Sequence, residues 1–165
     1  MQIIGVMGPG EQATVSDQQV AYDLGYQIAQ TGWVLLTGGR NTGVMDAASR
    51  GAKAAGGLTI GILPTHDRRN MSDAVDLAIV TDLGNARNNI NVLSSDVVIA
   101  CGMGVGTTSE IALAIKAGKP VILLNTSLEF QQFFRHLSHQ SVFVAESVTA
   151  AISIVQQQLN SDWQK

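Results

Sequence analysis

The sequence contains little cysteine, little proline and few charged residues. It has one cysteine, Cys101, which rules out an intramolecular disulfide framework. Proline is scarce at 3 residues, and charged residues make up only 14% of the chain. By contrast, 45% of the residues are apolar and 17 are glycine. This composition favours a folded protein with buried elements and tight turns over a disordered chain.

Long apolar runs and basic clusters are also missing. No run of 18 apolar residues exists, so no membrane-spanning helix is expected. The opening MQIIGVMGPG lacks a basic region, and its apolar run is too short for a signal peptide. The cytoplasm is therefore the expected location. The 10 Lys and Arg residues are scattered and the net charge is −3, so nucleic acid is not the expected partner. A small anionic ligand remains compatible, because backbone N–H groups bind phosphate without net positive charge.

The 165 residues fit one domain, 1–165, in which short apolar runs alternate with helical patterns. Ser16 and Gln19 match a capping box, which predicts a first helix from there to Gly32. Strands that are apolar throughout and separated by helices indicate a parallel sheet covered on both faces. The predicted fold class is therefore α/β: a three-layer, Rossmann-like fold with a mainly parallel sheet. Strands are expected at 2–7, 33–37, 58–63, 77–80, 96–100, 119–124 and 141–144, and further helices at 43–55, 85–95, 107–117, 128–137 and 146–159.

Three glycine-rich turns follow predicted strands, and right-handed crossovers would bring them to one edge of the sheet. Such sheets bind ligands beyond the strand C-termini, where the strand order reverses. The first turn, from Gly8 to Ala13, matches the dinucleotide pattern G-x-G-x-x-G/A by letter. Polar residues continue to Ser16, however, and no acid for a ribose follows the second strand. We therefore interpret this turn as the flexible rim of a ligand pocket.

The second turn runs from Gly38 to Gly43, which have Walker A spacing. Val44 and Met45 stand where a P-loop needs Lys and Ser or Thr, so this is not a P-loop. A glycine-rich turn that begins a helix still presents N–H groups to an anion. The alternative is a strand–helix turn that merely needs positive φ. The two adjacent glycines favour ligand binding.

The third turn, from Cys101 to Glu110, gives the strongest signal for a ligand site. Its alternate glycines let the backbone approach a ligand, and Thr107, Thr108 and Ser109 add hydroxyl groups at the start of the helix. A carboxylate here repels an anion, although it also stabilises a helix N-terminus. Glu110 is therefore interpreted either as a helix-dipole partner or as a group that binds a ribose hydroxyl or acts as acid or base.

Arg87 begins the predicted helix at 85–95, where a cation opposes the helix dipole. This misfit favours a role toward a ligand or a carboxylate, and the alternative is a solvated surface arginine. Asn88, Asn89 and Asn91 add amide groups nearby.

Other reactive side chains are expected to be structural. His136 and His139 lie three residues apart with no third ligand evident, so no metal site is predicted. Cys101 is expected to be a small buried hydrophobe. The helix at 107–117 is apolar around most of its circumference, so either the sheet and its neighbours or a second subunit must cover it, and we favour a homo-oligomer.

These motifs together resemble a known superfamily. The chain looks like the LOG-type cytokinin-activating phosphoribohydrolases and, more closely, the molybdenum cofactor carrier proteins; it is also similar to the Rossmann-like core of the DprA DNA-processing proteins. The phosphoribohydrolases carry G-G-G-x-x-G-L-M-G after the second strand. Gly38, Gly39, Gly43 and Met45 match this motif, and Arg40 replaces its third glycine.

The same enzymes carry P-G-G-x-G-T-x-x-E, preceded by an Arg-Lys pair. Gly104, Gly106, Thr107 and Glu110 match the motif, whereas Gly102 and Met103 replace the proline and the next glycine. Arg87 matches the arginine of the pair and Asn88 replaces the lysine. In the enzymes, the arginine and glutamate are the catalytic pair, so the resemblance implies that role for Arg87 and Glu110 if the chain is an enzyme.

The resemblance leaves two main functions open. The first is a carrier or binding protein for a phosphorylated heterocycle, either a molybdopterin-type cofactor or a nucleotide. The second is a phosphoribohydrolase that cleaves the N-glycosidic bond of a nucleoside 5′-monophosphate. DNA binding in the manner of DprA is disfavoured by the negative charge. The resemblance also implies a homo-dimer or homo-tetramer. The predicted ligand-binding residues are Gly8, Gly38, Gly39, Arg40, Gly43, Met45, Arg87, Asn88, Gly102, Gly104, Gly106, Thr107, Thr108 and Glu110.

Overall fold

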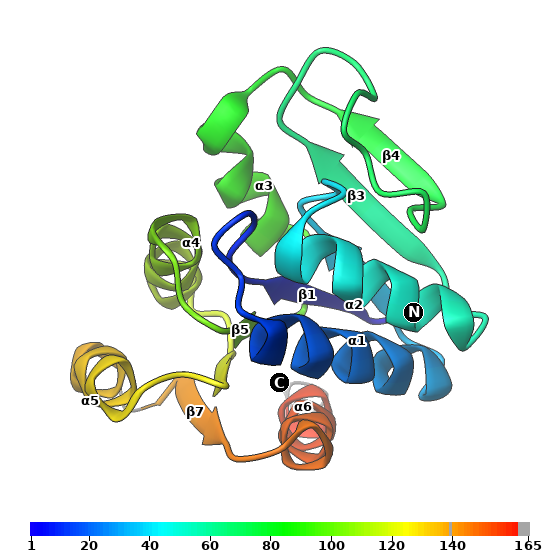
Figure 1. Ribbon diagram of the computed structural model, residues 1–165. Helices are drawn as coiled ribbons and strands as arrows, with labels where there is room; N and C mark the ends of the chain where they lie inside the picture. The colour runs from blue at the N-terminus through cyan, green and yellow to red at the C-terminus, as the bar shows by residue number, and fades with distance from the viewer. Residues whose placement is uncertain (139, 162–165) are drawn as a thin grey trace.

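The computed structural model describes residues 1–138 and 140–161 and has three layers, with a central seven-stranded sheet between two layers of helices (Figure 1). All the strand pairs run parallel, so the predicted fold class is confirmed. The strands are β1 (Ile3–Met7), β2 (Val34–Thr37), β3 (Thr59–Leu63), β4 (Leu77–Val80), β5 (Val97–Cys101), β6 (Val121–Leu124) and β7 (Val142–Ala145). The helices are α1 (Val15–Gln30), α2 (Gly43–Ala54), α3 (Arg87–Leu93), α4 (Val105–Lys116), α5 (Leu128–Leu137) and α6 (Val148–Ser161).

The strand order places a topological switch point at the centre of the sheet. The order is β4-β3-β2-β1-β5-β6-β7, so the chain moves outward from β1 in one direction, returns to β5 and continues in the other direction. Met7 at the end of β1 is paired with Ala100 near the end of β5. The loops that leave these two strands diverge to opposite faces of the sheet, and a crevice between them is the usual ligand position in such folds.

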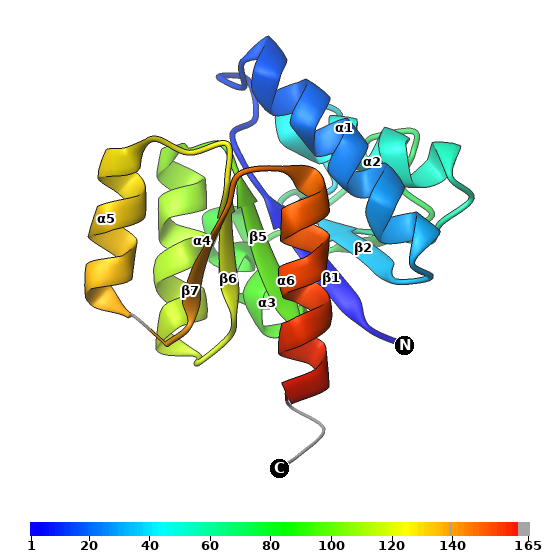
Figure 2. The ribbon, with the colours of Figure 1, turned by 90° about the horizontal axis from the view of Figure 1, so that it is seen from below.

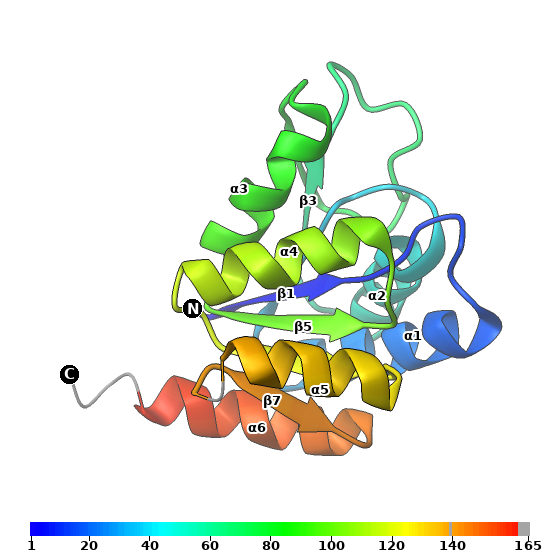
Figure 3. The same cartoon turned by 90° about the vertical axis from the view of Figure 1, so that its left-hand side faces the viewer.

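Two apolar cores fix the helices on the sheet. Side chains of α1, α2 and α6 pack against one face around Leu24, Val44 and Val155. Side chains of α3, α4 and α5 pack against the other around Val92, Ile111 and Phe134. Figures 2 and 3 show α1, α2 and α6 on one side of the strands and α3 and α4 on the other. The two layers hold α2 and α4 so that their N-termini lie at the same edge of the sheet.

Glycines bring α1 and α2 into backbone contact. A Cβ atom at Gly25 would collide with the carbonyl oxygen of Ala48, and one at Gly51 would collide with that of Tyr22. This close packing fixes α2, and therefore the loop before it, relative to the middle of α1.

Several element boundaries differ from the sequence predictions. The capping box at the start of α1 consists of Thr14 and Asp17 instead of Ser16 and Gln19, which lie inside the helix. The Asp17 carboxylate accepts hydrogen bonds from both the N–H and the hydroxyl of Thr14, at 2.9 and 2.8 Å. The charged carboxylate of Asp17 accepts stronger hydrogen bonds than the neutral amide of Gln19 could. This difference explains why Thr14, and not Ser16, caps the helix.

Other helices also shift relative to their predicted ranges. Helix α4 begins two residues early, at Val105, which places Gly106 and Thr107 in its first turn. A 3-10 turn, Gly84–Ala86, occupies the start of the predicted helix at 85–95, so α3 begins at Arg87. The last helix begins at Val148, two residues later than predicted.

Not every apolar segment is covered. Leu77, Ile79 and Val80 of the edge strand β4 are about half exposed, although the prediction treated this strand as buried on both faces. Helix α4 buries Ile111 and Ala114 but exposes Ala112, so only part of its circumference is covered by this chain. In the described residues, none of the helices has the length and apolar character needed to cross a membrane.

Candidate functional site

A cavity of about 430 Å³ lies at the C-terminal edge of the sheet, beside the switch point. It is enclosed by the loop between β1 and α1, the loop between β2 and α2, the start of α3 and the first turn of α4. The three glycine-rich turns therefore share one edge, as the parallel topology requires. The lining residues are Val6, Met7, Gly8, Pro9, Gly10, Glu11, Gln12, Gly38, Arg40, Met45, Asn85, Arg87, Asn88, Gly104, Val105, Gly106, Thr107 and Glu110.

The first turn of α4 carries hydrogen-bond donors that have no acceptor among the described residues. The N-cap residue, Gly104, has no side chain to cap the helix, and the first intrahelical bond runs from the Thr108 N–H to the Gly104 carbonyl at 2.8 Å. The amides of residues 105–107 therefore have no acceptor within the helix. The Thr107 side chain lines the cavity, is only 2% exposed, and its Oγ1 has no hydrogen-bond partner among the described residues.

Gly106 leaves space for a ligand at this helix start. Beyond its chain neighbours and its own helix backbone, a Cβ atom at Gly106 would meet no atom of the described residues within 4 Å, so their packing does not require a glycine here. The residue nonetheless lines the cavity beside Thr107. The open space, the uncapped amides and the unpartnered hydroxyl together form a binding position suited to a phosphate group.

Arg87 connects α3 to the ends of two strands. Its Nη1 atom donates hydrogen bonds to the carbonyl oxygens of Gly38 and Ile62, and its Nη2 atom lies 3.9 Å from the Met45 sulfur. Burial lowers the pKa of the guanidinium, Glu110 opposes this change, and Arg40 lowers the pKa further. An arginine pKa starts high enough for the group to stay charged, so Arg87 presents a fixed positive charge to the cavity. The position is therefore not that of a solvated surface arginine.

Glu110 lies in the second turn of α4 and is 7% exposed. Burial raises the pKa of its carboxyl group from 4.5 to about 7, although the Asn91 hydrogen bond and the Arg87 charge act in the opposite direction. The Asn91 Nδ2 donates to Glu110 Oε1 at 2.9 Å. Glu110 is thus poised to exist in both protonation states near neutral pH.

Polar contacts also join α3 to α4 at the rim of the cavity. The Asn88 Nδ2 donates to the Ser109 hydroxyl at 2.7 Å, and that hydroxyl donates to the Gly106 carbonyl at 2.8 Å. These contacts fix the first turn of α4 against α3.

Most of the predicted ligand-binding residues line the cavity, and four of them do not. Gly39, with φ of +73°, packs against the backbone of Gly61, and Gly43, with φ of +55°, packs against the carbonyls of the β1–α1 loop. Gly102, with φ of +73°, leaves space for the Asp17 carboxylate. The Thr108 hydroxyl bonds to the Gly104 carbonyl at 3.0 Å. These four residues shape the surrounding loops. The predicted residues in the lining are Gly8, Gly38, Arg40, Met45, Arg87, Asn88, Gly104, Gly106, Thr107 and Glu110.

Sequence reasoning missed two polar contacts of the site. Glu11, in the first glycine-rich turn, forms an ion pair with Arg40 at 3.4 Å. Asn91 was predicted to add an amide group near Arg87, but its bond with Glu110 was not predicted, because the two residues belong to different helices.

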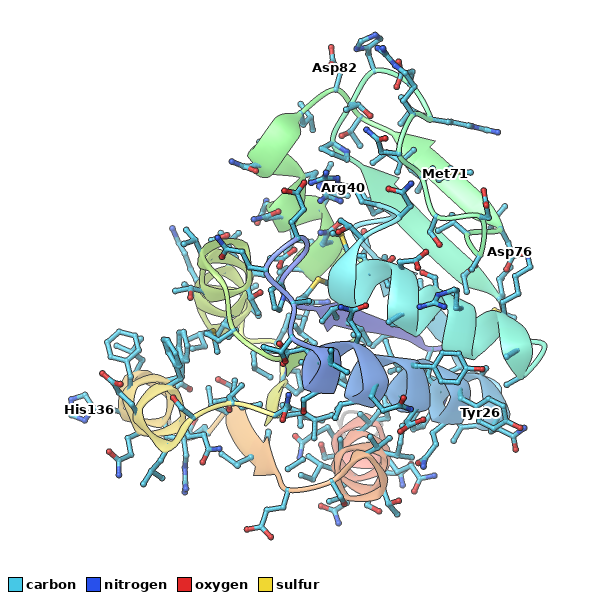
Figure 4. All side chains as sticks on the ribbon, in the orientation of Figure 1. Tyr26, Arg40, Met71, Asp76, Asp82 and His136 are labelled. Carbon is cyan, nitrogen blue, oxygen red and sulfur yellow. The ribbon has the colours of Figure 1, made fainter. Side chains whose placement is uncertain are left out.

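His136 and Cys101, which were not expected to take part in ligand binding, lie outside the cavity lining. In Figure 4, His136 projects outward from α5 at the left edge of the molecule, well away from Arg40. His139 lies outside the described residues. Cys101 is fully buried, and burial together with the Asp17 charge raises the pKa of its thiol to about 12, which disfavours the thiolate form that a nucleophile needs. Within the described ranges, no group of three or more His, Cys, Asp or Glu side chains could hold a metal ion.

Comparisons with known proteins agree with the resemblance seen in the sequence. The profile of the SLOG cluster4 family matches residues 1–152. A cytokinin riboside 5′-monophosphate phosphoribohydrolase from Mycobacterium tuberculosis is 34% identical over 115 residues, a match that covers 65% of this chain and 62% of that protein.

Solved structures extend the similarity over nearly the whole chain. The molybdenum cofactor binding protein from Rippkaea orientalis is 64% identical with a TM-score of 0.94, and the match covers 96% of this chain and 97% of that one. The molybdenum cofactor carrier protein from Chlamydomonas reinhardtii is 54% identical with a TM-score of 0.92, and the match covers 97% of this chain and 98% of that one. DNA processing protein A from Helicobacter pylori, at 21% identity and a TM-score of 0.70 over 94% of this chain and 80% of that one, shares the fold.

Proposed function

The chain belongs to the SLOG cluster4 family, and on that basis we propose that it is a carrier that binds a phosphorylated heterocycle of the molybdopterin type. The observation that carries this proposal is the Thr107 hydroxyl, which has no partner in the part of the chain that the structure describes, beside the uncapped amides of α4. A buried hydroxyl without a partner costs free energy of folding, and a ligand oxygen removes that cost. The two molybdenum cofactor proteins with matching structures supply the ligand class.

The residues that line the cavity offer suitable contacts for each part of such a ligand. Its phosphate is placed on the amides of residues 105–107 and the Thr107 hydroxyl, next to the open position at Gly106. Its remaining polar atoms face Arg87 and Arg40, which supply charged hydrogen-bond donors. Met7 and Met45 add polarisable apolar surface for a ring system.

The hydrogen bonds of Arg87 favour ligand binding over catalytic turnover. The Nη1 atom of Arg87 is already occupied by two backbone carbonyls, which reduces the number of its donors available to a reacting group. The sequence departs from the phosphoribohydrolase motifs at Asn88, Gly102 and Met103. These features favour binding and release of an unchanged ligand.

Cofactor retention tests the proposal. Molybdenum cofactor released from a molybdoenzyme is mixed with the purified protein without oxygen, and the mixture is passed through a size-exclusion column. The pterin in each fraction is then oxidised and measured by fluorescence. We expect pterin to elute with the protein in comparable molar amount; pterin found only in the small-molecule fractions would refute the carrier function.

A phosphoribohydrolase is the second candidate function. The observation in its favour is that Arg87 and Glu110 line the same cavity and that Glu110 has a pKa of about 7, which suits general acid–base catalysis near neutral pH. Release of free base from a panel of nucleoside 5′-monophosphates tests it, with Glu110→Gln as the control. Base release that the variant abolishes establishes hydrolysis, and no release from any nucleotide excludes hydrolysis of the nucleotides tested.

A further inference from the structure

Two oppositely charged side chains meet across the cavity. Glu11 belongs to the β1–α1 loop and Arg40 to the β2–α2 loop, and both residues line the cavity. The Arg40 Nη2 atom lies 3.4 Å from Glu11 Oε1, with the Glu11 side chain 79% exposed and that of Arg40 37% exposed. Figure 4 shows Arg40 between the start of α2 and α3, facing the β1–α1 loop. We call this ion pair the loop latch.

The backbone on both sides of the loop latch is anchored. Arg40 forms a bridge with Met71, and the flanking Asn41 N–H donates to the Asn70 carbonyl at 2.8 Å. In the opposite loop, the Pro9 carbonyl accepts a hydrogen bond from the Val44 N–H at 3.0 Å. Breaking the latch therefore requires only movement of the two side chains.

The positive charges of the cavity favour separation of the Glu11 and Arg40 side chains when an anion is bound. An exposed ion pair is weak in water, so a well-placed anion competes with Glu11 for Arg40. Arg40 and Arg87 line one cavity, and the charge of Arg40 lowers the pKa of Arg87, as expected for two cations that repel each other. An anionic group near both arginines relieves this repulsion.

We propose that the loop latch selects ligands that carry two separate anionic groups, because the second group must displace Glu11 from Arg40. One anionic group binds at the first turn of α4, and the other takes the place of the Glu11 carboxylate. This inference rests on the proposed carrier function. A molybdopterin-type cofactor belongs to this class, since it carries a phosphate and, separately, a metal-binding dithiolate.

The test is a double-mutant cycle with molybdenum cofactor as the probe. Its affinity is measured by pterin fluorescence for the wild type, Glu11→Gln, Arg40→Gln and the double variant. Glu11→Gln should bind about two- to fivefold more tightly, because Arg40 is released from the pair. Arg40→Gln should bind about tenfold more weakly, because a charged hydrogen bond is lost. The double variant should match Arg40→Gln, since Glu11 acts only through Arg40.

A matched charge control is Glu129→Gln on α5, which removes the same charge from an exposed position outside the cavity lining and should leave the affinity unchanged. Equal affinities across the cycle, or a Glu11→Gln effect that persists without Arg40, would overturn the latch. Failure of the wild type to retain cofactor would instead reject the carrier function, and the latch with it. The two failures are therefore distinguished by whether the wild type binds.

Discussion

The Asn91 amide nitrogen lies 2.9 Å from Glu110 Oε1, and both side chains are buried between α3 and α4. This bond holds a carboxyl group at the wall of the cavity in a place where burial disfavours its charge. Its pKa is raised from 4.5 to about 7. The site therefore keeps an ionisable group at a cost to folding stability, and that cost depends on pH.

Glu110→Gln should change how stability depends on pH. Because the folded-state pKa is raised, the folded protein binds more protons than the unfolded chain between pH 4.5 and about 7. The resulting stabilisation is fully present below pH 4.5 and is lost as pH rises to about 7. Over this range the free energy of unfolding of the wild type should fall by up to about 3 kcal/mol relative to that of the variant. Urea unfolding at a series of pH values measures the stability of the wild type and of the variant. If the two stabilities changed with pH in parallel, the raised pKa of Glu110 would be contradicted.

Thr107→Val should separate stability from binding. The substitution replaces an unpartnered hydroxyl with a methyl group of similar size, so the free energy of unfolding should stay within about 0.5 kcal/mol of the wild type or rise. Cofactor affinity should fall about tenfold, because a hydrogen bond to the ligand is lost. Thermal unfolding and fluorescence titration measure the two effects.

Thr59→Val is the matched control for that experiment. Thr59 is equally buried, but its hydroxyl is bonded to the Ala74 carbonyl at 2.6 Å and to Asp76 at 2.9 Å, outside the cavity lining. It should lose about 1–3 kcal/mol of stability while the folded protein keeps its cofactor affinity. A loss of stability in Thr107→Val as large as that in Thr59→Val would show that the Thr107 hydroxyl has a partner in the protein.

Arg87→Lys tests whether geometry matters beyond charge. A lysine ammonium is a compact charge and does not reproduce the planar group that bonds to the carbonyls of Gly38 and Ile62. The variant should lose about 1 kcal/mol of stability and bind the cofactor more weakly despite its equal charge. Urea unfolding together with cofactor titration measures both quantities. Wild-type behaviour in both would show that Arg87 acts through its charge alone.

The fold and the location of the site follow from local sequence patterns. Apolar runs that alternate with helical segments require a parallel sheet, and a parallel sheet places every strand–helix turn at one edge. The turns after β1, β2 and β5 were therefore placed together correctly. The exposure of β4 was not predicted, because the run LAIV has the composition of a central strand and nothing local marks it as an edge.

The contacts inside the site could not be predicted in the same way. The bonds of Arg87 to Gly38 and Ile62 join segments that are distant in the sequence, so no local pattern reports them. The same holds for the Glu11–Arg40 pair, which depends on how two loops face each other. The start of α1 was misplaced because Thr14 and Ser16 begin overlapping patterns, and only the bonds of Asp17 decide between them.

The most direct test of the site is the cofactor affinity of Gly106→Ala. Outside its own helix, the added methyl group meets no atom of the described residues within 4 Å, and alanine favours a helix over glycine, so the folded protein should be as stable as the wild type or about 0.5–1 kcal/mol more stable. If a phosphate occupies this space, the methyl group blocks it, and affinity should fall at least about tenfold while stability is retained. Wild-type affinity in a stable Gly106→Ala protein would contradict the placement of the ligand on α4.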